Sequence, residues 1–387
     1  PLAPEDAEWG RPQWALGMRS WGFTTSGQVL AVVSREGEDS LVRLDPKTGH
    51  RERVTLPFTA LPAIDVEGEQ AVLLAAGPRE APTLVLLDAT SGQWQTLATA
   101  FDVSVCGSAV SVARAIQFES SAGGEAHAFL YAPVGEGVAG PPAERPPLLV
   151  KSHGGPTSAT SSALKLGIQY WTQRGFAVVD VNYGGSTGYG RAYRERLDGQ
   201  WGILDVEDCI AAARHTSELG IADPERWLVS GGSAGGYTTL CALTFHDVFA
   251  AGASHYGIGD LEALVRDTHK FESRYMERLV GPYATQRALY QERSPIHSPE
   301  RLSCPVIFFQ GMEDKVVPPG QADEMVKALA ARGVPHAYVT FEGEGHGFRR
   351  ATNIQAALEG ELWFYGQVLG FETAAPARAI RLERAGS

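Results

Sequence analysis

Two kinds of hydrophobic pattern follow each other along the chain. Up to about residue 130, short apolar runs alternate with turns, and one stretch recurs with an offset of 43 residues. Residues 41–45 (Leu-Val-Arg-Leu-Asp), followed by Thr48-Gly49, match residues 84–88 (Leu-Val-Leu-Leu-Asp), followed by Ser91-Gly92. A period near 40–45 residues built from short β-rich runs is typical of β-propeller blades. We therefore predict blades over residues 1–130; the alternative is a small antiparallel β domain in which two hairpins resemble each other by chance.

The predicted propeller is incomplete. Closed propellers usually have four to eight blades, whereas this stretch offers two blades and a remnant. Exposed blade edges would also invite pairing with other chains. We therefore expect that further blades precede Pro1 and either were lost or stay associated as a separate N-terminal propeller fragment. A complete closed domain within residues 1–130 would contradict this expectation.

A different pattern follows a stretch rich in Gly and Pro. Residues 131–147 show repeated Gly and Pro without periodicity, which predicts a linker between two domains. Beyond it, short continuous apolar runs alternate with helix-like stretches, the pattern of a doubly wound α/β domain with buried parallel strands. We predict this domain over residues 148–372, with a C-terminal tail at 373–387. The predicted strands are 148–151, 177–181, 227–230, 250–253 and 306–309, and the predicted helices are 161–174, 204–219, 234–245, 320–332 and 353–369. Residues 257–302 interrupt this alternation of apolar runs and helix-like stretches. We predict that they form a helical excursion over the sheet, a common place for substrate contacts.

Composition narrows the range of partners. The chain has 387 residues and a formal net charge of −12, which argues against binding to nucleic acid or to an anionic membrane surface. It contains no apolar run of about 18 residues, so we predict no membrane span. The four cysteines are far apart and form no CxxC pair, which favours free thiols in the cytoplasm over a metal or redox site.

The strongest chemical signal is the segment 227–237, Trp-Leu-Val-Ser-Gly-Gly-Ser-Ala-Gly-Gly-Tyr. Here G-x-S-x-G follows a buried strand and opens a helix, the context in which this motif presents a nucleophilic serine. Glycines at 231 and 235 allow the neighbouring backbone to pass the sharp turn without a clash. We predict that Ser233 is the nucleophile of an α/β-hydrolase; the alternative is a phosphate-binding or structural loop.

A serine hydroxyl needs a base within hydrogen-bond reach, and α/β-hydrolases supply it in the chain order Ser, acid, His. After the strand at 306–309, either Glu313 or Asp314 can be the acid. We favour Asp314 because Gly311 and the short carboxylate match the turn after this strand in related hydrolases. His346 lies in a Gly-rich loop after the last apolar run and is the predicted general base.

Two backbone amides are predicted to form the oxyanion hole. The segment His153-Gly154-Gly155-Pro156 follows the strand at 148–151, and a Gly-rich turn there can present N–H groups to the nucleophile. We assign the hole to the amides of Gly155 and Ala234, with Gly154 as the alternative donor. The predicted chemistry is acyl transfer, and it requires no metal and no organic cofactor.

Together these segments resemble the prolyl oligopeptidase family of serine peptidases, particularly its acylaminoacyl-peptidase and dipeptidyl-aminopeptidase-like branch. The resemblance covers residues 148 to about 370, including 182–190 (Asn-Tyr-Gly-Gly-Ser-Thr-Gly-Tyr-Gly), 199–202 (Gly-Gln-Trp-Gly) and 231–236. It implies short peptide substrates, an N-terminal propeller that excludes large substrates, and frequent homo-oligomers. We therefore expect an exopeptidase or an acylaminoacyl-peptidase-like oligopeptidase.

Charged side chains near the site indicate which end of a peptide is recognised. A free carboxyl end is bound best by Arg, and a free amino end is bound by acidic side chains. Arg191, Arg266 and Arg274 are candidates for substrate binding, and Tyr256, just before the excursion, is another. Solvated helix faces are the alternative role for such arginines. Two other functions remain open: a carboxylesterase would use the same three residues, and a binding module without catalysis would be expected to have lost one of them.

Overall fold

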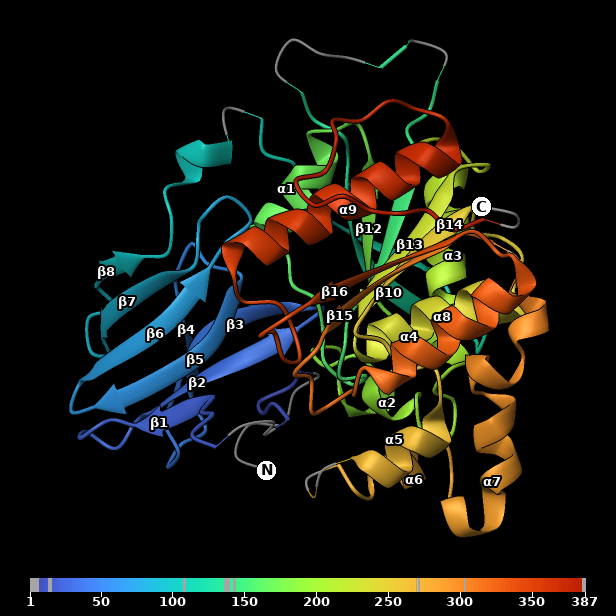
Figure 1. The fold of residues 1–387 in the computed structure, drawn as a ribbon. Coiled ribbons are helices and arrows are strands. Elements are labelled where there is room, and N and C mark those ends of the chain that lie inside the picture. Colours follow the sequence, from blue (N-terminus) through green and yellow to red (C-terminus); the bar gives the residue numbers. More distant parts are fainter. Residues whose placement is uncertain are drawn as a thin grey trace.

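The computed structural model describes residues 7–12, 16–106, 109–135, 140–141, 144–268, 270, 272–302 and 304–384. Part of the predicted linker, including Gly137 and Pro142, lies outside the described residues. Figure 1 shows two small sheets, in blue, beside a large central sheet that is covered by helices on both faces. Within the described part of the chain, no helix has both the length and the apolar character of a membrane span.

The two small sheets are four-stranded antiparallel meanders with the same strand order. The first contains β1 (Trp21–Phe23), β2 (Val29–Arg35), β3 (Glu38–Leu44) and β4 (Arg51–Val54), and the second contains β5 (Ala60–Glu67), β6 (Gln70–Ala76), β7 (Thr83–Asp88) and β8 (Trp94–Thr99). The two copies of the sequence repeat coincide with β3 and β7, the third strand of each sheet. Leu30 and Leu41 of the first sheet pack with Leu73 and Val85 of the second in one apolar cluster. This arrangement is that of neighbouring propeller blades.

The large sheet has the strand order β16-β15-β14-β13-β11-β12-β10-β9. Its first six strands run parallel, whereas β10 pairs antiparallel with both β12 and β9. Its strands are β9 (Arg114–Glu119), β10 (Glu125–Tyr131), β11 (Leu148–Ser152), β12 (Ala177–Asn182), β13 (Trp227–Gly232), β14 (Ala251–His255), β15 (Val306–Gly311) and β16 (His336–Phe341).

The hairpin β9–β10 lies in the range that the sequence pattern assigned to the blades, but it belongs to the large sheet. Its residues Phe118 and Ala128 share an apolar cluster with Leu148 and Val150 of β11. Its edge strand β9 has the alternating pattern of a strand with one buried face, and blade strands have the same pattern. The predicted blade region, residues 1–130, therefore includes two strands that belong to the large sheet in the structure.

Helices cover the large sheet on two faces, as the alternating pattern predicts. On one face, α1 (Leu166–Thr172) and α9 (Ala351–Leu369) contribute Trp171 and Phe364 to a cluster with Leu149 and Leu228. The other face carries α3 (Leu204–Glu218), α4 (Ala234–Phe245) and α8 (Gly320–Arg332), while the short α2 (Arg191–Glu195) precedes α3. Helices α4 and α8 have the bounds that the sequence predicts.

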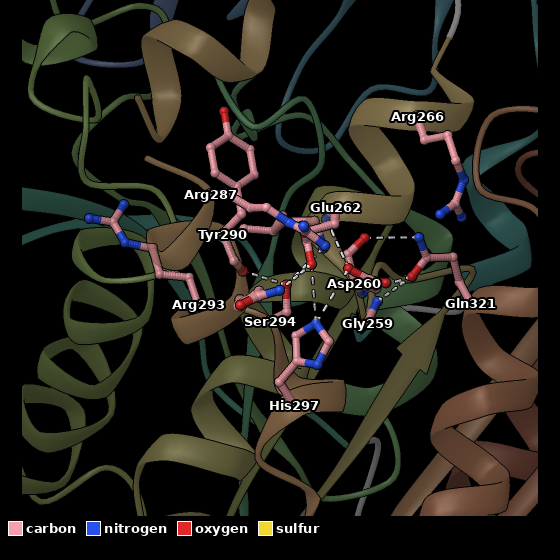
Figure 2. Close-up of polar contacts among 12 residues, drawn as sticks. Gly259, Asp260, Glu262, Arg266, Arg287, Tyr290, Arg293, Ser294, His297 and Gln321 are labelled. Carbon is pink, nitrogen blue, oxygen red and sulfur yellow. Dashed lines mark hydrogen bonds and ion pairs between the residues drawn. The ribbon is translucent and has the colours of Figure 1, made fainter. Parts of the chain in front are cut away.

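The excursion after β14 is helical, as expected. It consists of α5 (Leu261–Asp267), α6 (Tyr275–Leu279) and α7 (Tyr283–Glu292), followed by two short 3₁₀ turns (Pro295–His297 and Pro299–Arg301). Figure 2 shows the polar cluster that anchors its start. The side-chain oxygen of Gln321 on α8 accepts hydrogen bonds from the amides of Gly259 (2.9 Å) and Asp260 (2.8 Å), and Asp260 caps α5 by accepting from the Glu262 amide (2.8 Å).

The last described residues return along the edge of the large sheet. His336 at the start of β16 and Glu383 exchange two backbone hydrogen bonds of 3.1 and 2.8 Å. Ala377 also donates its amide to the Glu359 carboxylate on α9 (2.8 Å). The described part of the predicted tail is thus attached to the edge strand of the sheet.

Candidate active site

Ser233 lies on the sharp turn between β13 and α4. Its backbone has φ 57° and ψ −123°, a region that residues with a side chain rarely adopt. A Cβ atom at Gly231 would lie 2.3 Å from the carbonyl oxygen of Gly235, and one at Gly235 would lie 2.2 Å from that of Ser152. These two close approaches are the physical reason for glycine at both positions of the motif. The turn presents the serine side chain at the carboxyl edge of the parallel sheet.

Loops after β15 and β16 bring two more predicted residues to Ser233. His346 Nε2 lies 2.9 Å from Ser233 Oγ, and His346 Nδ1 lies 2.7 Å from Asp314 Oδ2. The other oxygen of Asp314 accepts the amides of Val316 (2.8 Å) and Val317 (2.9 Å). The Asp314 side chain is completely buried, whereas that of His346 is 24% exposed. The structure therefore brings the three residues into one hydrogen-bonded chain that opens to solvent only on the side of Ser233 and His346.

The loop that carries His346 is fixed by Glu344, a residue that the sequence analysis missed. Its carboxylate accepts hydrogen bonds from the amides of Arg349 and Arg350 (3.0 Å each) and from the Asn353 side chain (2.8 Å), where α9 begins. These bonds, that from Asn353 foremost, lower the pKa of Glu344 below its usual range. No local pattern in the sequence marks this role, because Glu344 lies seven residues before the first residue of α9, Ala351.

The Gly-rich loop after β11 lies directly against the serine. A Cβ atom at Gly154 would be 3.6 Å from Ser233 Cβ and 3.3 Å from the carbonyl oxygen of Gly232. Among the described residues, the amides of Gly155 and Ala234 donate to no other group. Ala234 is the first residue of α4, where amides lack an intrahelical acceptor. Both predicted oxyanion donors are therefore free to bind an anionic oxygen near Ser233.

The four predicted substrate-binding residues separate into two groups. Tyr256 lies at the site, with its ring 5.0 Å from that of His346 (centroid to centroid) and 5.2 Å from that of Phe348. Burial raises the pKa of Tyr256 above its ordinary value, so this phenol stays neutral. A Cβ atom at Gly232 would be only 3.0 Å from the Tyr256 ring. Tyr256 thus forms part of the wall beside the serine.

Among the described residues, no hydrogen bond or ion pair joins the three arginines to Ser233, His346 or Asp314. Arg191 is exposed and lines a cavity of about 540 Å³ together with Thr157 and Tyr275. Arg266 is exposed and forms an ion pair with its neighbour Asp267 at 3.0 Å, and Figure 2 shows it apart from the polar cluster around Asp260. Arg274 is exposed just before α6. A solvated or structural role describes Arg266 better than substrate binding does.

A metal site is not found in the described part of the chain: no group of three or more His, Cys, Asp or Glu side chains there could hold a metal ion. The side chains that meet at the site are a serine hydroxyl, an imidazole and a buried carboxylate, a set that can carry out covalent acyl transfer.

Comparison with known proteins identifies the family. The model of the "Prolyl oligopeptidase family" matches residues 162–372, which is more than half of the chain. The chain belongs to this family. The prediction made from the motifs is thereby confirmed, and so is the predicted fold class, because the solved relatives of this family combine a propeller with an α/β-hydrolase domain.

Several members of the prolyl oligopeptidase family are similar to this chain over much of its length. A solved puromycin-hydrolyzing peptidase from Mycobacterium tuberculosis is 42% identical with a TM-score of 0.93, covering 99% of this chain and 58% of that one. The dipeptidyl aminopeptidase BIII of Pseudoxanthomonas mexicana is 33% identical over 58% of this chain and 33% of its own length. The acylamino-acid-releasing enzyme of Arabidopsis thaliana is 31% identical over 56% of this chain and 30% of its own. The chain thus aligns with about a third of the length of these two curated relatives.

Proposed function

We propose that the chain carries the catalytic site of a serine peptidase that hydrolyses short peptides or aminoacyl amides. The observation that carries the proposal is the hydrogen-bonded chain Ser233–His346–Asp314, with Ser233 on a strained turn and Asp314 buried. In this proposal Ser233 is the nucleophile, His346 the general base and Asp314 the acid that orients the imidazole.

The hydrogen-bond geometry supports a defined direction of proton transfer. A carboxylate can only accept, so His346 Nδ1 carries the hydrogen that points to Asp314, and Nε2 is free to accept the Ser233 proton. As the serine oxygen attacks the carbonyl carbon, His346 takes its proton and the amides of Gly155 and Ala234 stabilise the oxyanion. His346 then protonates the leaving amine, and water repeats the two steps on the acyl-enzyme to release the acid.

The similarity to puromycin-hydrolyzing peptidases supports a narrower substrate class. Puromycin is an amino acid joined through an amide to an aminonucleoside, and its hydrolysis releases an amino acid with a free ammonium group. We infer that this chain cleaves the amide after a small number of amino-terminal residues, which is the exopeptidase alternative. The acylaminoacyl-peptidase-like alternative would require a blocked amino group instead.

Mass-spectrometric mapping of products tests this function. The substrates are puromycin and short peptides with free, acetylated or amidated ends, and the variants are Ser233→Ala and, as a matched control, Ser91→Ala in a hairpin turn of the second blade. We expect hydrolysis that requires a free amino end, is abolished in Ser233→Ala and is retained in Ser91→Ala. No amide turnover together with rapid hydrolysis of p-nitrophenyl esters would instead establish the carboxylesterase.

Three further proposals concern the cellular compartment of the enzyme and its association with other chains. The free thiols of Cys209, Cys241 and Cys304 support a reducing compartment such as the cytoplasm. Homo-oligomerisation and association with an N-terminal propeller fragment are proposed from the family resemblance. The mass of the purified protein in solution, measured by light scattering, tests both forms of association.

A further inference from the structure

A second strained residue lies beside the nucleophile. Among the described residues that are not glycine, only Glu36, Ser233 and Tyr256 have a positive φ, and the last two follow the adjacent strands β13 and β14. Tyr256 has φ 40°, and a Cβ atom at Gly232 would be 3.0 Å from its ring. Conformations of this kind persist only where the surrounding contacts hold them. Ser233 and Tyr256 therefore need a support that is shared by both.

His255 joins these two residues through its main chain. It is the last residue of β14, directly before Tyr256, and its carbonyl oxygen accepts the Ser233 amide at 3.0 Å. On the other side, the Tyr256 amide donates to the carbonyl oxygen of Phe309 on β15 at 2.7 Å. A shift of His255 therefore moves the nucleophile and the neighbouring wall of the site together.

The side chain of His255 is held by α9. Its Nε2 lies 3.0 Å from Glu361 Oε2, and its ring stacks on that of Phe309 with centroids 4.6 Å apart. A carboxylate can only accept, so Nε2 carries the hydrogen. The other oxygen of Glu361 accepts from the Tyr365 hydroxyl at 3.0 Å, one turn later on the same helix. Both the place and the ring orientation of His255 are thus set by these contacts.

Glu361 is a buried charge that the proposed reaction does not use. Its side chain is 2% exposed, and burial by itself would raise its pKa. The hydrogen bond and charge of His255, with the charge of Lys151 on β11, outweigh burial and leave the pKa of Glu361 below its ordinary value. Well-packed apolar side chains usually stabilise a fold as well as a buried ion pair does. The place of this pair beneath two strained residues favours a role in geometry over one in stability.

The same contacts reach the general base. The Tyr256 ring lies edge-on to the His346 ring with centroids 5.0 Å apart, and the ring of Phe348 packs on Tyr256 at 5.2 Å. The backbone conformation of Tyr256 decides where its ring meets the imidazole. His255 therefore acts on both partners of the proton transfer, on Ser233 through its carbonyl and on His346 through Tyr256.

We propose that His255 and Glu361 are positioning residues that keep Ser233 and His346 at hydrogen-bond distance, with α9 as their support. This inference rests on the proposed acyl transfer at Ser233, and neither residue touches the substrate in it. Loss of the bond between Nε2 and the carboxylate should therefore lower the reactivity of Ser233 and leave substrate binding unchanged.

Two substitutions at position 255 test this bond. The amide nitrogen of Gln reaches the place of Nε2 and can still donate to Glu361, whereas that of Asn reaches only the place of Nδ1. Both variants lose the stack on Phe309. We expect His255→Gln to keep kcat within about fivefold of wild type and His255→Asn to lower it about 50-fold, approaching the effect of a misplacement of about 1 Å. KM should change by less than about twofold in both, because the lost interaction acts on the chemical step.

The partner on α9 gives a second test. Glu361→Gln keeps an acceptor for Nε2 and nearly the same shape, so kcat should stay within about fivefold, whereas Glu361→Leu removes the acceptor and should lower kcat about 50-fold. The rate at which a fluorophosphonate modifies Ser233 should fall in parallel with kcat, because that reaction needs the serine and its base but no peptide contacts. His215→Asn on α3, whose ring lies beside Phe118, is the matched control and should keep wild-type kcat.

Thermal melting of each variant separates positioning from folding. Equal kcat and equal fluorophosphonate rates in His255→Gln and His255→Asn, measured well below their melting temperatures, would overturn the inference, as would a rise in KM with kcat unchanged. If the variants at 255 and 361 do not fold, Tyr365→Phe decides, because it removes only the hydroxyl that holds the second oxygen of Glu361. Wild-type kcat in that variant contradicts the proposal, and a lowered kcat with unchanged KM supports it. Absence of amide and ester turnover in the wild-type protein would instead refute the proposed function.

Discussion

Replacing Gly235 by Ala tests how closely the nucleophile turn is packed against β11. A Cβ atom at this position would lie 2.2 Å from the carbonyl oxygen of Ser152 and 2.9 Å from that of His153. Real Cβ atoms essentially never come within 3.0 Å of another heavy atom, so either α4 or the start of the Gly-rich loop must shift by roughly 0.8 Å. Both segments are backbone, and the Ser152 hydroxyl already donates to the Gly235 carbonyl at 2.9 Å, so neither can move alone.

The expected effect is on both stability and rate. Overpacking of this kind destabilises a protein by about 1–3 kcal/mol. A displacement near 1 Å between nucleophile and oxyanion donors lowers the rate about 100-fold. Chemical denaturation gives the free energy of unfolding, and steady-state hydrolysis of a peptide or ester substrate gives kcat.

Gly167→Ala is the matched control for the same chemical change. Gly167 lies in α1, and a Cβ atom there would meet nothing within 4 Å. Alanine in a helix restricts the unfolded chain, so this variant should be stabilised by about 0.5 kcal/mol with kcat unchanged. Wild-type stability and kcat in Gly235→Ala would refute the argument that the glycine is required by a backbone contact.

Two further predictions concern the pH dependence of stability. Burial raises the pKa of Asp205 to about 6 from 3.8, so between these values the folded protein holds a proton that the unfolded chain has lost. This proton makes the free energy of unfolding fall as the pH rises from about 4 to about 6. In denaturation curves measured at each pH, the Asp205→Asn variant should lack this contribution to the fall. At the start of the excursion, hydrogen bonds from Arg287 and Gln291 lower the pKa of Glu262 to about 2 from 4.5 (Figure 2). Above about pH 4.5 the Glu262→Gln variant should therefore lack the whole stabilisation that the Glu262 carboxylate provides. The difference in free energy of unfolding between wild type and variant should disappear as the pH falls towards 2, and a difference independent of pH would contradict the argument.

The sequence predicted the five parallel strands β11 to β15 of the large sheet because their signals are local. The buried strands are continuous apolar runs, and helices α4 and α8 begin and end where the pattern indicates. The same local signals made Ser233, Asp314 and His346 the candidates that the structure brings into hydrogen-bond distance, because each follows a buried strand and the carboxyl ends of parallel strands meet at one edge. The sequence repeat likewise marked the corresponding strands β3 and β7.

Only the tertiary structure decided how segments distant in sequence meet. The hairpin β9–β10 resembles a blade by pattern, and its pairing with β12 depends on which sheet offers a free edge. Arg266 and Tyr256 were equal candidates in the sequence, yet one forms an ion pair at the surface and the other lies against His346. The contact of His153 with Ser186, 33 residues away, was equally hidden. Periodicity records which face of an element is buried, whereas the partner of a side chain is set by packing between elements, and that leaves no local pattern in the sequence.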